Sequence, residues 1–258
     1  MKSLIQIIRA TLALAGALLI ALPCAADDKG VTGPTDAAAL KQKLAKYLQL
    51  DEDISITFTA FPDFYAARFP SGKFSPVFFD KDLNVVLNAY GVGWFSLQGK
   101  TKLNEAQVNS LTQKLINSLP LKLAIKMNQG GKGVVMVERT AVDCPECGPQ
   151  ERKLLDMKGF NWYLFPTYLA TENRNRAIAV YCSPNPAQAW RTLMVEKKTI
   201  PDQKDCGYPD EKFRDIAYMI PRGASVSMFK NGTVIRGGQG DELEKAIHAA
   251  QDSKAYFD

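Results

Sequence analysis

Apolar and polar residues in the first hundred positions follow helical spacing in one segment and strand-like spacing in the next. Pro34-Thr35-Asp36 is typical of a helix start, and an apolar stripe at helical spacing follows it: Leu40, Leu44, Tyr47 and Leu48. From Ile54 to Phe58 apolar and polar residues alternate, which predicts a half-buried strand. Further strand-like runs follow, separated by turn residues: FYAARF, SPVFFD, NVVLNAYGV and WFSLQG. We therefore expect a small α+β segment that ends near Gly99.

A single amphipathic helix is predicted next. Asn104 and Gln107 form a capping-box pattern at its start, and Pro120 ends it. Between them runs one apolar stripe: Val108, Leu111, Leu115 and Leu119. A lone helix between two differently patterned halves is typical of a connector.

The second half of the chain alternates strands and helices. Its predicted elements are a strand at 134–140, a helix that opens at the CPEC motif and continues through 151–157, a strand at 160–169, a polar stretch with helical pieces at 171–212, a hairpin at 225–238 and a helix at 241–252. Asn231-Gly232 predicts a two-residue turn in the hairpin. From residue 121 the order is therefore strand, helix, strand, helical insert, hairpin and helix.

The first 26 residues have the pattern of a secretory signal peptide. Basic residues precede an apolar stretch from Thr11 to Leu22 that is too short to span a bilayer, and small residues up to Ala26 provide a cleavage site. An uncleaved membrane anchor is the alternative. Cys24 also raises the question of a lipid anchor, although Pro23 stands where a lipoprotein signal has a small residue.

Composition and charge exclude some classes of protein. With 258 residues and 46% apolar content, the chain is long enough for one large or two modest folded domains. Loss of residues 1–26 removes Lys2 and Arg9 and lowers the formal charge from +5 to +3, which gives no case for nucleic-acid binding. The cysteines that remain form an even set, which is expected to pair in an exported chain: 144, 147, 182 and 206.

The Cys144-Pro145-Glu146-Cys147 motif lies where a predicted strand gives way to a predicted helix. A cysteine at a helix N-terminus is stabilised as the thiolate, so Cys144 is the expected nucleophile. Cys147 would lie one turn further on, close enough to resolve a mixed disulfide. An inert structural disulfide is the alternative. A zinc site is disfavoured because the sequence offers no second CxxC and a single histidine, His248.

The order of these elements and motifs resembles the periplasmic disulfide-bond isomerases of the DsbC and DsbG type. The resemblance covers nearly all of the chain after the signal, from LKQKLAKYLQL and ISITF through the CxxC and the later cysteine pair to NGTVIRGGQ. It implies an α+β fold in three parts. These are a cystatin-like dimerisation domain at 27–100, a linker helix at 101–120 and a thioredoxin-like catalytic domain with a helical insertion at 121–258.

The same resemblance implies a function and its residues. Cys144 would attack and Cys147 resolve, with no cofactor beyond this redox-active pair, while Cys182 and Cys206 would form a non-catalytic disulfide in the insertion. The implied protein is a periplasmic homodimeric isomerase or reductase that acts on misfolded exported proteins and is kept reduced by a DsbD-like inner-membrane protein. The alternative is a redox-weak chaperone or binding protein that serves a specialised secretion or conjugation system.

Two positions depart from the family pattern. The family has a cis-proline before the hairpin strand, where this chain has Ala224-Ser225, and Pro221 could take that role only with a local shift. A trans peptide is expected before Ser225, because a cis bond there costs about 2.5–4 kcal/mol. Within the motif, Pro145 and Glu146 are the residues expected to tune the cysteines. The Glu146 carboxylate disfavours a nearby thiolate and the helix dipole favours it, so the sign of the net effect is open.

Overall fold

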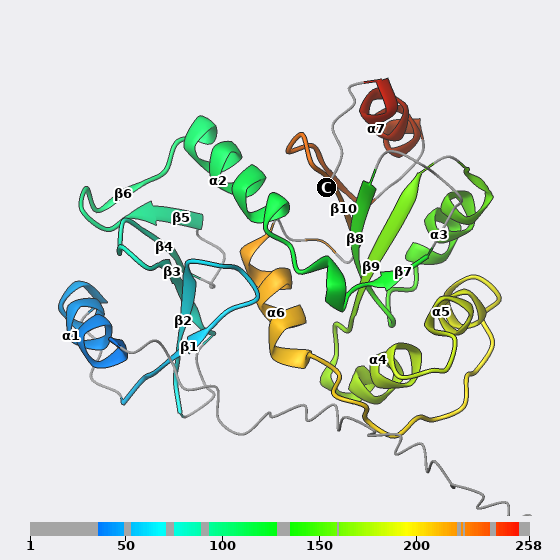
Figure 1. Ribbon diagram of the computed structural model, residues 1–258, viewed down its shortest axis with the longest axis horizontal. Helices are drawn as coiled ribbons and strands as arrows, with labels where there is room; N and C mark the ends of the chain where they lie inside the picture. Colours follow the sequence, from blue (N-terminus) through cyan, green and yellow to red (C-terminus); the bar gives the residue numbers. More distant parts are fainter. Residues whose placement is uncertain are drawn as a thin grey trace, which may run out of the picture. The chain divides into compact units, whose positions relative to one another are not determined.

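The computed structural model describes residues 36–48, 53–70, 75–88, 93–127, 135–158, 160–220, 223, 225–237 and 241–252. The predicted signal segment at 1–26, Pro221 and Ala224 lie outside these residues. Within the described ranges, no helix has the length and apolar character needed to cross a membrane. The α+β class predicted from the sequence is confirmed, and the strands form two separate sheets (Figure 1).

The first sheet has six antiparallel strands in sequence order. They are β1 (Ser55–Phe58), β2 (Phe64–Arg68), β3 (Val77–Asp80), β4 (Val85–Asn88), β5 (Gly93–Ser96) and β6 (Thr101–Lys102). Helix α1 (Ala37–Leu48) packs Leu40 and Leu44 onto one face of this sheet, against a cluster that includes Ile56 and Phe79. The opposite face is also buried, through residues such as Phe78 and Trp94. The inner strands therefore bury side chains on both faces, whereas β1 alternates buried Ile56 with exposed Ser55 and Phe58, which confirms the half-buried strand predicted there.

Helix α2 (Glu105–Asn117) confirms the predicted capping box. The Gln107 N–H donates to Asn104 Oδ1 at 2.9 Å, and the Asn104 N–H donates to Gln107 Oε1 at 3.0 Å. Leu115, which belongs to the predicted stripe, is fully buried. Its neighbour Ile116, which does not belong to the stripe, is fully buried as well. The range predicted as a linker therefore begins with strand β6, continues with α2 and ends at the short 3-10 helix η1 (Leu121–Leu123).

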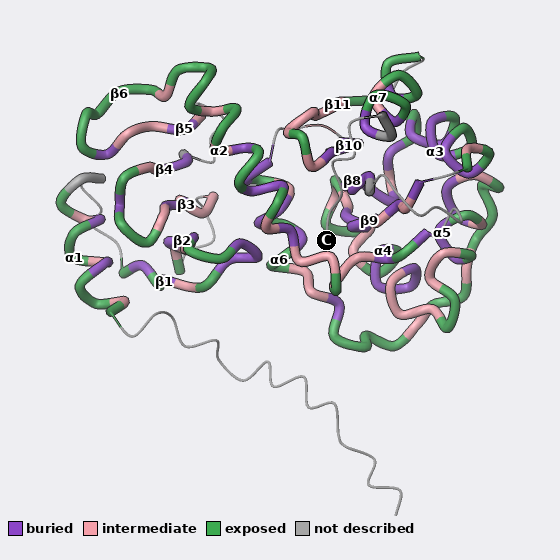
Figure 2. Tube along the Cα trace, turned by 45° about the horizontal axis from the view of Figure 1, so that its top comes forward, coloured by how far each residue is buried: buried purple, intermediate pink, exposed green. Residues whose placement is uncertain are grey.

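The second sheet has five strands in the order β11-β10-β8-β9-β7. They are β7 (Ile125–Lys126), β8 (Val135–Ala141), β9 (Asn161–Thr167), β10 (Ser225–Phe229) and β11 (Val234–Arg236). Strands β8 and β9 pair in parallel and are linked by helix α3 (Cys147–Asp156), while β10 pairs antiparallel with both β8 and β11. This is the predicted thioredoxin-like arrangement. Strand β8 is buried from Met136 to Ala141, and β9 is buried from Leu164 to Thr167 (Figure 2).

The insertion between β9 and β10 is helical. It contains η2 (Thr171–Asn173), α4 (Arg174–Tyr181), α5 (Pro186–Met194) and α6 (Asp210–Met219), and α7 (Asp241–Asp252) follows the hairpin. The helical part extends beyond the predicted end near residue 212, because α6 buries Phe213, Ile216 and Met219 after that point.

The hairpin between β10 and β11 is confirmed, but its turn is longer than predicted. The Phe229 N–H donates to the Thr233 carbonyl at 3.0 Å and the Gly232 N–H donates to the Phe229 carbonyl at 2.9 Å, so Lys230 joins Asn231 and Gly232 in the turn. Gly232 has φ +87°, a backbone conformation that glycine adopts without strain.

Candidate active site

The CPEC motif forms the turn between β8 and α3. The Cys144 N–H donates to the Ala141 carbonyl at 3.1 Å, which folds the chain back at the end of β8. The helix begins at Cys147, and Pro149 lies in its first turn, where a missing N–H costs no intrahelical hydrogen bond. The two cysteines are joined in a disulfide, with their Cα atoms 5.5 Å apart.

One detail of the sequence prediction is wrong. Cys144 was expected at the helix N-terminus with Cys147 a turn further on, but Cys147 occupies the first helical position and Cys144 lies in the preceding turn. The hydrogen bond to Ala141 keeps Cys144 at the strand end, which delays the start of the helix. The N–H groups in the first turn of α3 therefore lie nearer to Cys147 than to Cys144 along the chain.

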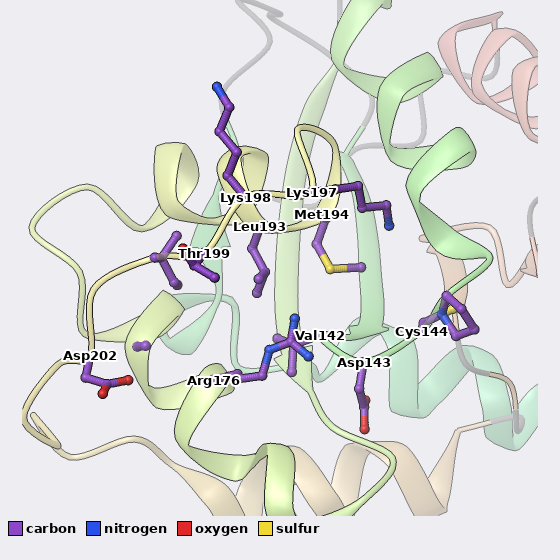
Figure 3. A pocket seen from close by; sticks show the side chains of 13 residues that line it. Val142, Asp143, Cys144, Arg176, Leu193, Met194, Lys197, Lys198, Thr199 and Asp202 are labelled. Carbon is purple, nitrogen blue, oxygen red and sulfur yellow. The ribbon is translucent and has the colours of Figure 1, made fainter.

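Both cysteines are largely buried, with exposed fractions of 5% for Cys144 and 4% for Cys147. A cavity of about 550 Å³ adjoins the motif, and Cys144 and Pro145 form part of its wall (Figure 3). Pro145 and Glu146 are themselves exposed. Glu146 occupies the N-cap position of α3 without a side-chain capping bond, so its expected tuning role stays a prediction.

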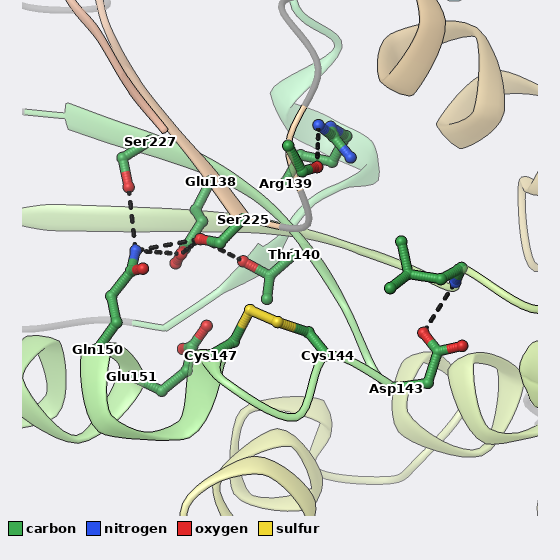
Figure 4. Close-up of a disulfide and its surroundings, with 12 residues drawn as sticks. Glu138, Arg139, Thr140, Asp143, Cys144, Cys147, Gln150, Glu151, Ser225 and Ser227 are labelled. Carbon is green, nitrogen blue, oxygen red and sulfur yellow. Dashed lines mark hydrogen bonds between the residues drawn. A yellow bond between two sulfur atoms is a disulfide. The ribbon is translucent and has the colours of Figure 1, made fainter. Parts of the chain in front are cut away.

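A network of buried polar side chains lies beside the disulfide (Figure 4). Its centre is Glu138 on β8, which is fully buried. Glu138 Oε1 accepts hydrogen bonds from the Ser225 hydroxyl at 2.7 Å and from Gln150 Nε2 at 3.0 Å. The Ser225 hydroxyl also lies 3.1 Å from Gln150 Nε2 and 3.3 Å from the Thr140 hydroxyl. Strands β8 and β10 and helix α3 are thus held together by one polar cluster.

A second fully buried carboxyl group belongs to Glu151 on α3. Its Oε2 accepts a hydrogen bond from the Trp190 indole N–H at 2.9 Å. Among the described residues, Glu151 Oε1 and Glu138 Oε2 have no hydrogen-bond partner. Burial raises the pKa of Glu138 to about 7, and burial together with repulsion from Glu138 raises the pKa of Glu151 well above its ordinary value. The site therefore retains carboxyl protons at pH values where exposed glutamates are ionised.

Sequence analysis did not identify Glu138, Gln150 or Glu151 as site residues. The available signal was a glutamate inside the apolar run VVMVERT, because a charged residue in a buried strand calls for a specific partner.

Ser225, predicted to stand where the family has a cis-proline, begins β10 and pairs with Thr140 of β8. It is 1% exposed, and its hydroxyl makes the hydrogen bond to Glu138 described above. The described residues contain no cis peptide bond. Because Ala224 and Pro221 lie outside them, the expected trans bond before Ser225 stays a prediction. The position thus supplies a hydroxyl donor that a proline could not supply.

The other two cysteines are also joined. Cys182 follows α4 and Cys206 precedes α6, and their Cα atoms lie 5.6 Å apart in a disulfide. The Cys206 N–H lies 3.1 Å from Cys182 Sγ. This bond closes the helical insertion, in the place that the family resemblance implies.

The chain is similar in sequence to curated proteins that are named thiol:disulfide interchange proteins. The chain is 30% identical over 135 residues to a protein of Bordetella parapertussis named "Probable thiol:disulfide interchange protein DsbC", which covers 51% of this chain and 48% of that protein. A protein of the same name from Bordetella pertussis is 29% identical over 133 residues, 50% of this chain and 47% of that protein. The chain is similar to these DsbC proteins over about half of its own length. The predicted resemblance to the DsbC and DsbG type is confirmed to that extent.

The chain spans about half the length of the curated relatives it matches. No family model matches it. Two solved structures show a weak likeness. A disulfide interchange protein from Neisseria gonorrhoeae has a TM-score of 0.44 and 23% identity, covering 52% of this chain and 99% of that one. Helicobacter pylori DsbG has a TM-score of 0.27 and 18% identity, covering 82% and 90%. Similarities this weak support no structural argument beyond the chain's own topology.

Proposed function

We propose that the protein is a periplasmic thiol:disulfide oxidoreductase that isomerises or reduces non-native disulfides in exported proteins through Cys144 and Cys147. The observation that carries the proposal is the position of the pair. Both cysteines lie at the junction of β8 and α3, and of the two only Cys144 forms part of the cavity wall. The similarity to proteins named thiol:disulfide interchange protein adds support.

The proposed reaction begins from the reduced pair. The Cys144 thiolate attacks one sulfur of a substrate disulfide, forms a mixed disulfide and releases the other substrate sulfur as a thiolate. In isomerisation, a different substrate thiolate attacks the substrate sulfur of the mixed disulfide, which restores the Cys144 thiolate. In reduction, the Cys147 thiolate attacks Cys144 Sγ, which releases the substrate thiolate and leaves the disulfide that the structure contains.

The buried acids give this site a pH dependence of its own. Glu138 and Glu151 have raised pKa values because burial penalises their charged forms. We expect the exchange rate to vary with their protonation as well as with the thiolate fraction of Cys144.

The proposed assembly is a homodimer formed through residues 27–100. Strands β1 and β6 are the edges of the first sheet, and pairing with a second copy would satisfy one of them. Misfolded exported proteins are the proposed substrates, and a DsbD-like membrane protein is the proposed reductant. A protein mass that stays monomeric in sedimentation at micromolar concentration would contradict the dimer.

Isomerisation of a scrambled multi-disulfide protein tests the activity. We expect the wild-type protein, reduced beforehand and freed of the reductant, to restore native disulfides in a glutathione-free buffer, and Cys144→Ala to lose this activity entirely. Cys147→Ala should keep the first attack and accumulate mixed disulfides with substrate. Equal rates for the wild type and Cys144→Ala would contradict the proposal.

The burial of both cysteines favours a second candidate, a chaperone that uses the fold more than the thiols. This candidate predicts that Cys144→Ala suppresses the aggregation of an unfolded protein as well as the wild type does, while neither protein isomerises disulfides. The two assays together therefore separate the candidates.

A further inference from the structure

The cavity beside Cys144 has a mixed wall. It lies between the CPEC turn, helix α4 and the loop after α5 (Figure 3). Its volume of about 550 Å³ falls within the range of small-molecule sites. Apolar side chains form part of the wall, namely Val142, Ala179, Leu193 and Met194. Charged side chains form another part, namely Asp143, Arg176, Lys197, Lys198 and Asp202.

The cavity wall has three basic and two acidic side chains, so its formal charge is +1. Asp143 already accepts three hydrogen bonds, from the N–H groups of Leu169 at 2.8 Å and Ala170 at 2.9 Å and from Asn173 Nδ2 at 3.0 Å. Asp202 lies at the opposite end of the cavity from Cys144 in Figure 3.

The three basic residues differ in what they already contact. Lys198 forms an ion pair with Glu196 at 3.0 Å, and its side chain points away from the other labelled residues in Figure 3. Arg176 has one long hydrogen bond, from Nη1 to Asn173 Oδ1 at 3.4 Å. Among the described residues, Lys197 forms no hydrogen bond or ion pair, although it attracts the buried Glu151 carboxyl group at longer range. Arg176 and Lys197 therefore retain donors for an anion.

The backbone places Lys197 against the CPEC helix. Lys197 has φ +57°, a left-handed conformation that non-glycine residues rarely adopt. Its Nζ lies so close to the first turn of α3 that a Cβ added to Gly148 would come within 2.8 Å of it. The ammonium group thus lies beside the residue that follows Cys147.

We infer that this cavity binds small thiols that carry carboxylates, with glutathione as the representative of the class, and that Arg176 and Lys197 hold the carboxylates while the thiol reacts with Cys144. The inference rests on the proposed redox function of the cysteine pair. A reacting ligand must bring a sulfur to Cys144, and two cations with free donors select an anionic ligand. The volume of about 550 Å³ fits a ligand of about tripeptide size.

The reaction at this site is a balanced exchange. The thiolate of the bound thiol attacks Cys144 Sγ, a new S–S bond forms, and the Cys144–Cys147 bond breaks with the electron pair on Cys147. Cys147 is the leaving thiolate and lies in the first turn of α3, where free N–H groups stabilise it. A second thiolate attacks the small-thiol sulfur and releases the small disulfide and the Cys144 thiolate. Two thiols are oxidised and the protein disulfide is reduced.

The test compares glutathione with its diethyl ester, which has the same sulfur but no free carboxylate. The second-order rate constant for opening the Cys144–Cys147 bond is measured in the full mature chain at low salt, by trapping free thiols and weighing the protein. Rates are normalised to thiolate concentration, because the two thiols differ in pKa. We expect glutathione to react about fivefold faster than the ester with the wild type, from two partly exposed charge contacts.

The double variant Arg176→Gln/Lys197→Gln should bring this ratio close to one. Lys198→Gln is the matched control, because it removes one positive charge from the same loop but leaves the ratio unchanged. A ratio that the double variant does not alter, or that Lys198→Gln lowers as much, would overturn the inference and leave the redox function intact.

Two further outcomes are decisive. If neither thiol opens the bond in the wild type, the proposed redox function fails and this inference fails with it. The assay is also run with a pair of longer peptides that differ only in Glu or Gln next to their cysteine. If Arg176 and Lys197 discriminate between these peptides but not between glutathione and its ester, the cavity serves polypeptides and the assignment to small thiols is overturned.

Discussion

The two disulfides of this chain lie in opposite surroundings. Cys144 and Cys147 are separated by three positions and are almost fully buried. Cys182 and Cys206 are separated by 24 positions, and Cys206 is exposed. Burial alone would make the first bond structural and the second reactive, which is the reverse of the roles proposed for them. Loop length and the neighbouring charges separate the two bonds better than exposure does.

The carboxyl groups near the two bonds have pKa values displaced in opposite directions. Burial raises the pKa of Glu138, beside Cys144–Cys147, to about 7. Hydrogen bonds from the N–H groups of Tyr208 and Gly207, together with the charge of Arg174, lower the pKa of Asp205 next to Cys206. One site therefore favours neutral acids and the other favours a carboxylate.

Removal of each disulfide in turn gives the largest expected contrast. The longer loop of Cys182–Cys206 constrains the unfolded chain more, so Cys182→Ala/Cys206→Ala should lower the free energy of unfolding by about 3–4 kcal/mol. The same relation gives about 2 kcal/mol for Cys144→Ala/Cys147→Ala, whose loop is much shorter. Urea denaturation of the oxidised proteins measures both losses. A larger loss for the CPEC pair would reverse the comparison.

Much of this contrast could be predicted from the sequence, but the buried acids could not. The CxxC at a strand-to-helix junction and the Asn-Gly hairpin could be predicted because each depends on residues that are neighbours along the chain. Glu138 is buried because β8 is a central strand with apolar neighbours on both faces, so alternate positions are not solvent-facing. Glu151 Oε2 accepts its hydrogen bond from Trp190, which lies 39 positions away, and no local spacing indicates that contact.

Glu138→Gln tests the acidic surroundings of the first bond. The folded-state pKa of Glu138 is raised by burial from 4.5 to about 7, so the folded protein binds its proton more tightly than the unfolded chain does. The stability of the wild type should therefore fall as pH rises from about 4.5 to 7, by up to about 3 kcal/mol. The amide cannot ionise, so the variant should lose the share of this slope that comes from Glu138 and keep the share that comes from Glu151. Urea denaturation between pH 4 and 8 makes the comparison, and parallel curves would contradict it.

Ser225→Ala tests the hydroxyl that replaces the family proline. The variant removes the 2.7 Å hydrogen bond to Glu138, which should cost about 1–3 kcal/mol because the acceptor is buried. The same bond lowers the pKa of Glu138, so its loss should raise that pKa further. The destabilisation should thus be larger at pH 8 than at pH 5. Ser227→Ala is the control, since the hydroxyl of Ser227 lies at a longer 3.5 Å from Gln150; equal losses in the two variants would contradict a special role for Ser225.

Asp205→Asn should have the smallest effect, and its pH dependence should be opposite to that of Glu138. The asparagine oxygen can still accept the N–H groups of Gly207 at 2.9 Å and Tyr208 at 2.8 Å, so the variant loses only a charge that faces Arg174 at 3.5 Å. Because the site is open to solvent, we expect a loss below about 1 kcal/mol at pH 7 that shrinks in high salt. The N–H groups of Tyr208 and Gly207 and the charge of Arg174 lower the pKa of Asp205. The ionised side chain therefore adds to the free energy of unfolding above the ordinary pKa of 3.8, and this contribution disappears as pH falls through the folded-state pKa. Thermal unfolding at pH 7 and pH 2.5, with and without salt, measures this. A loss that stays constant at pH 2.5 would mean that packing, and not charge, distinguishes the surroundings of the second disulfide from those of the first.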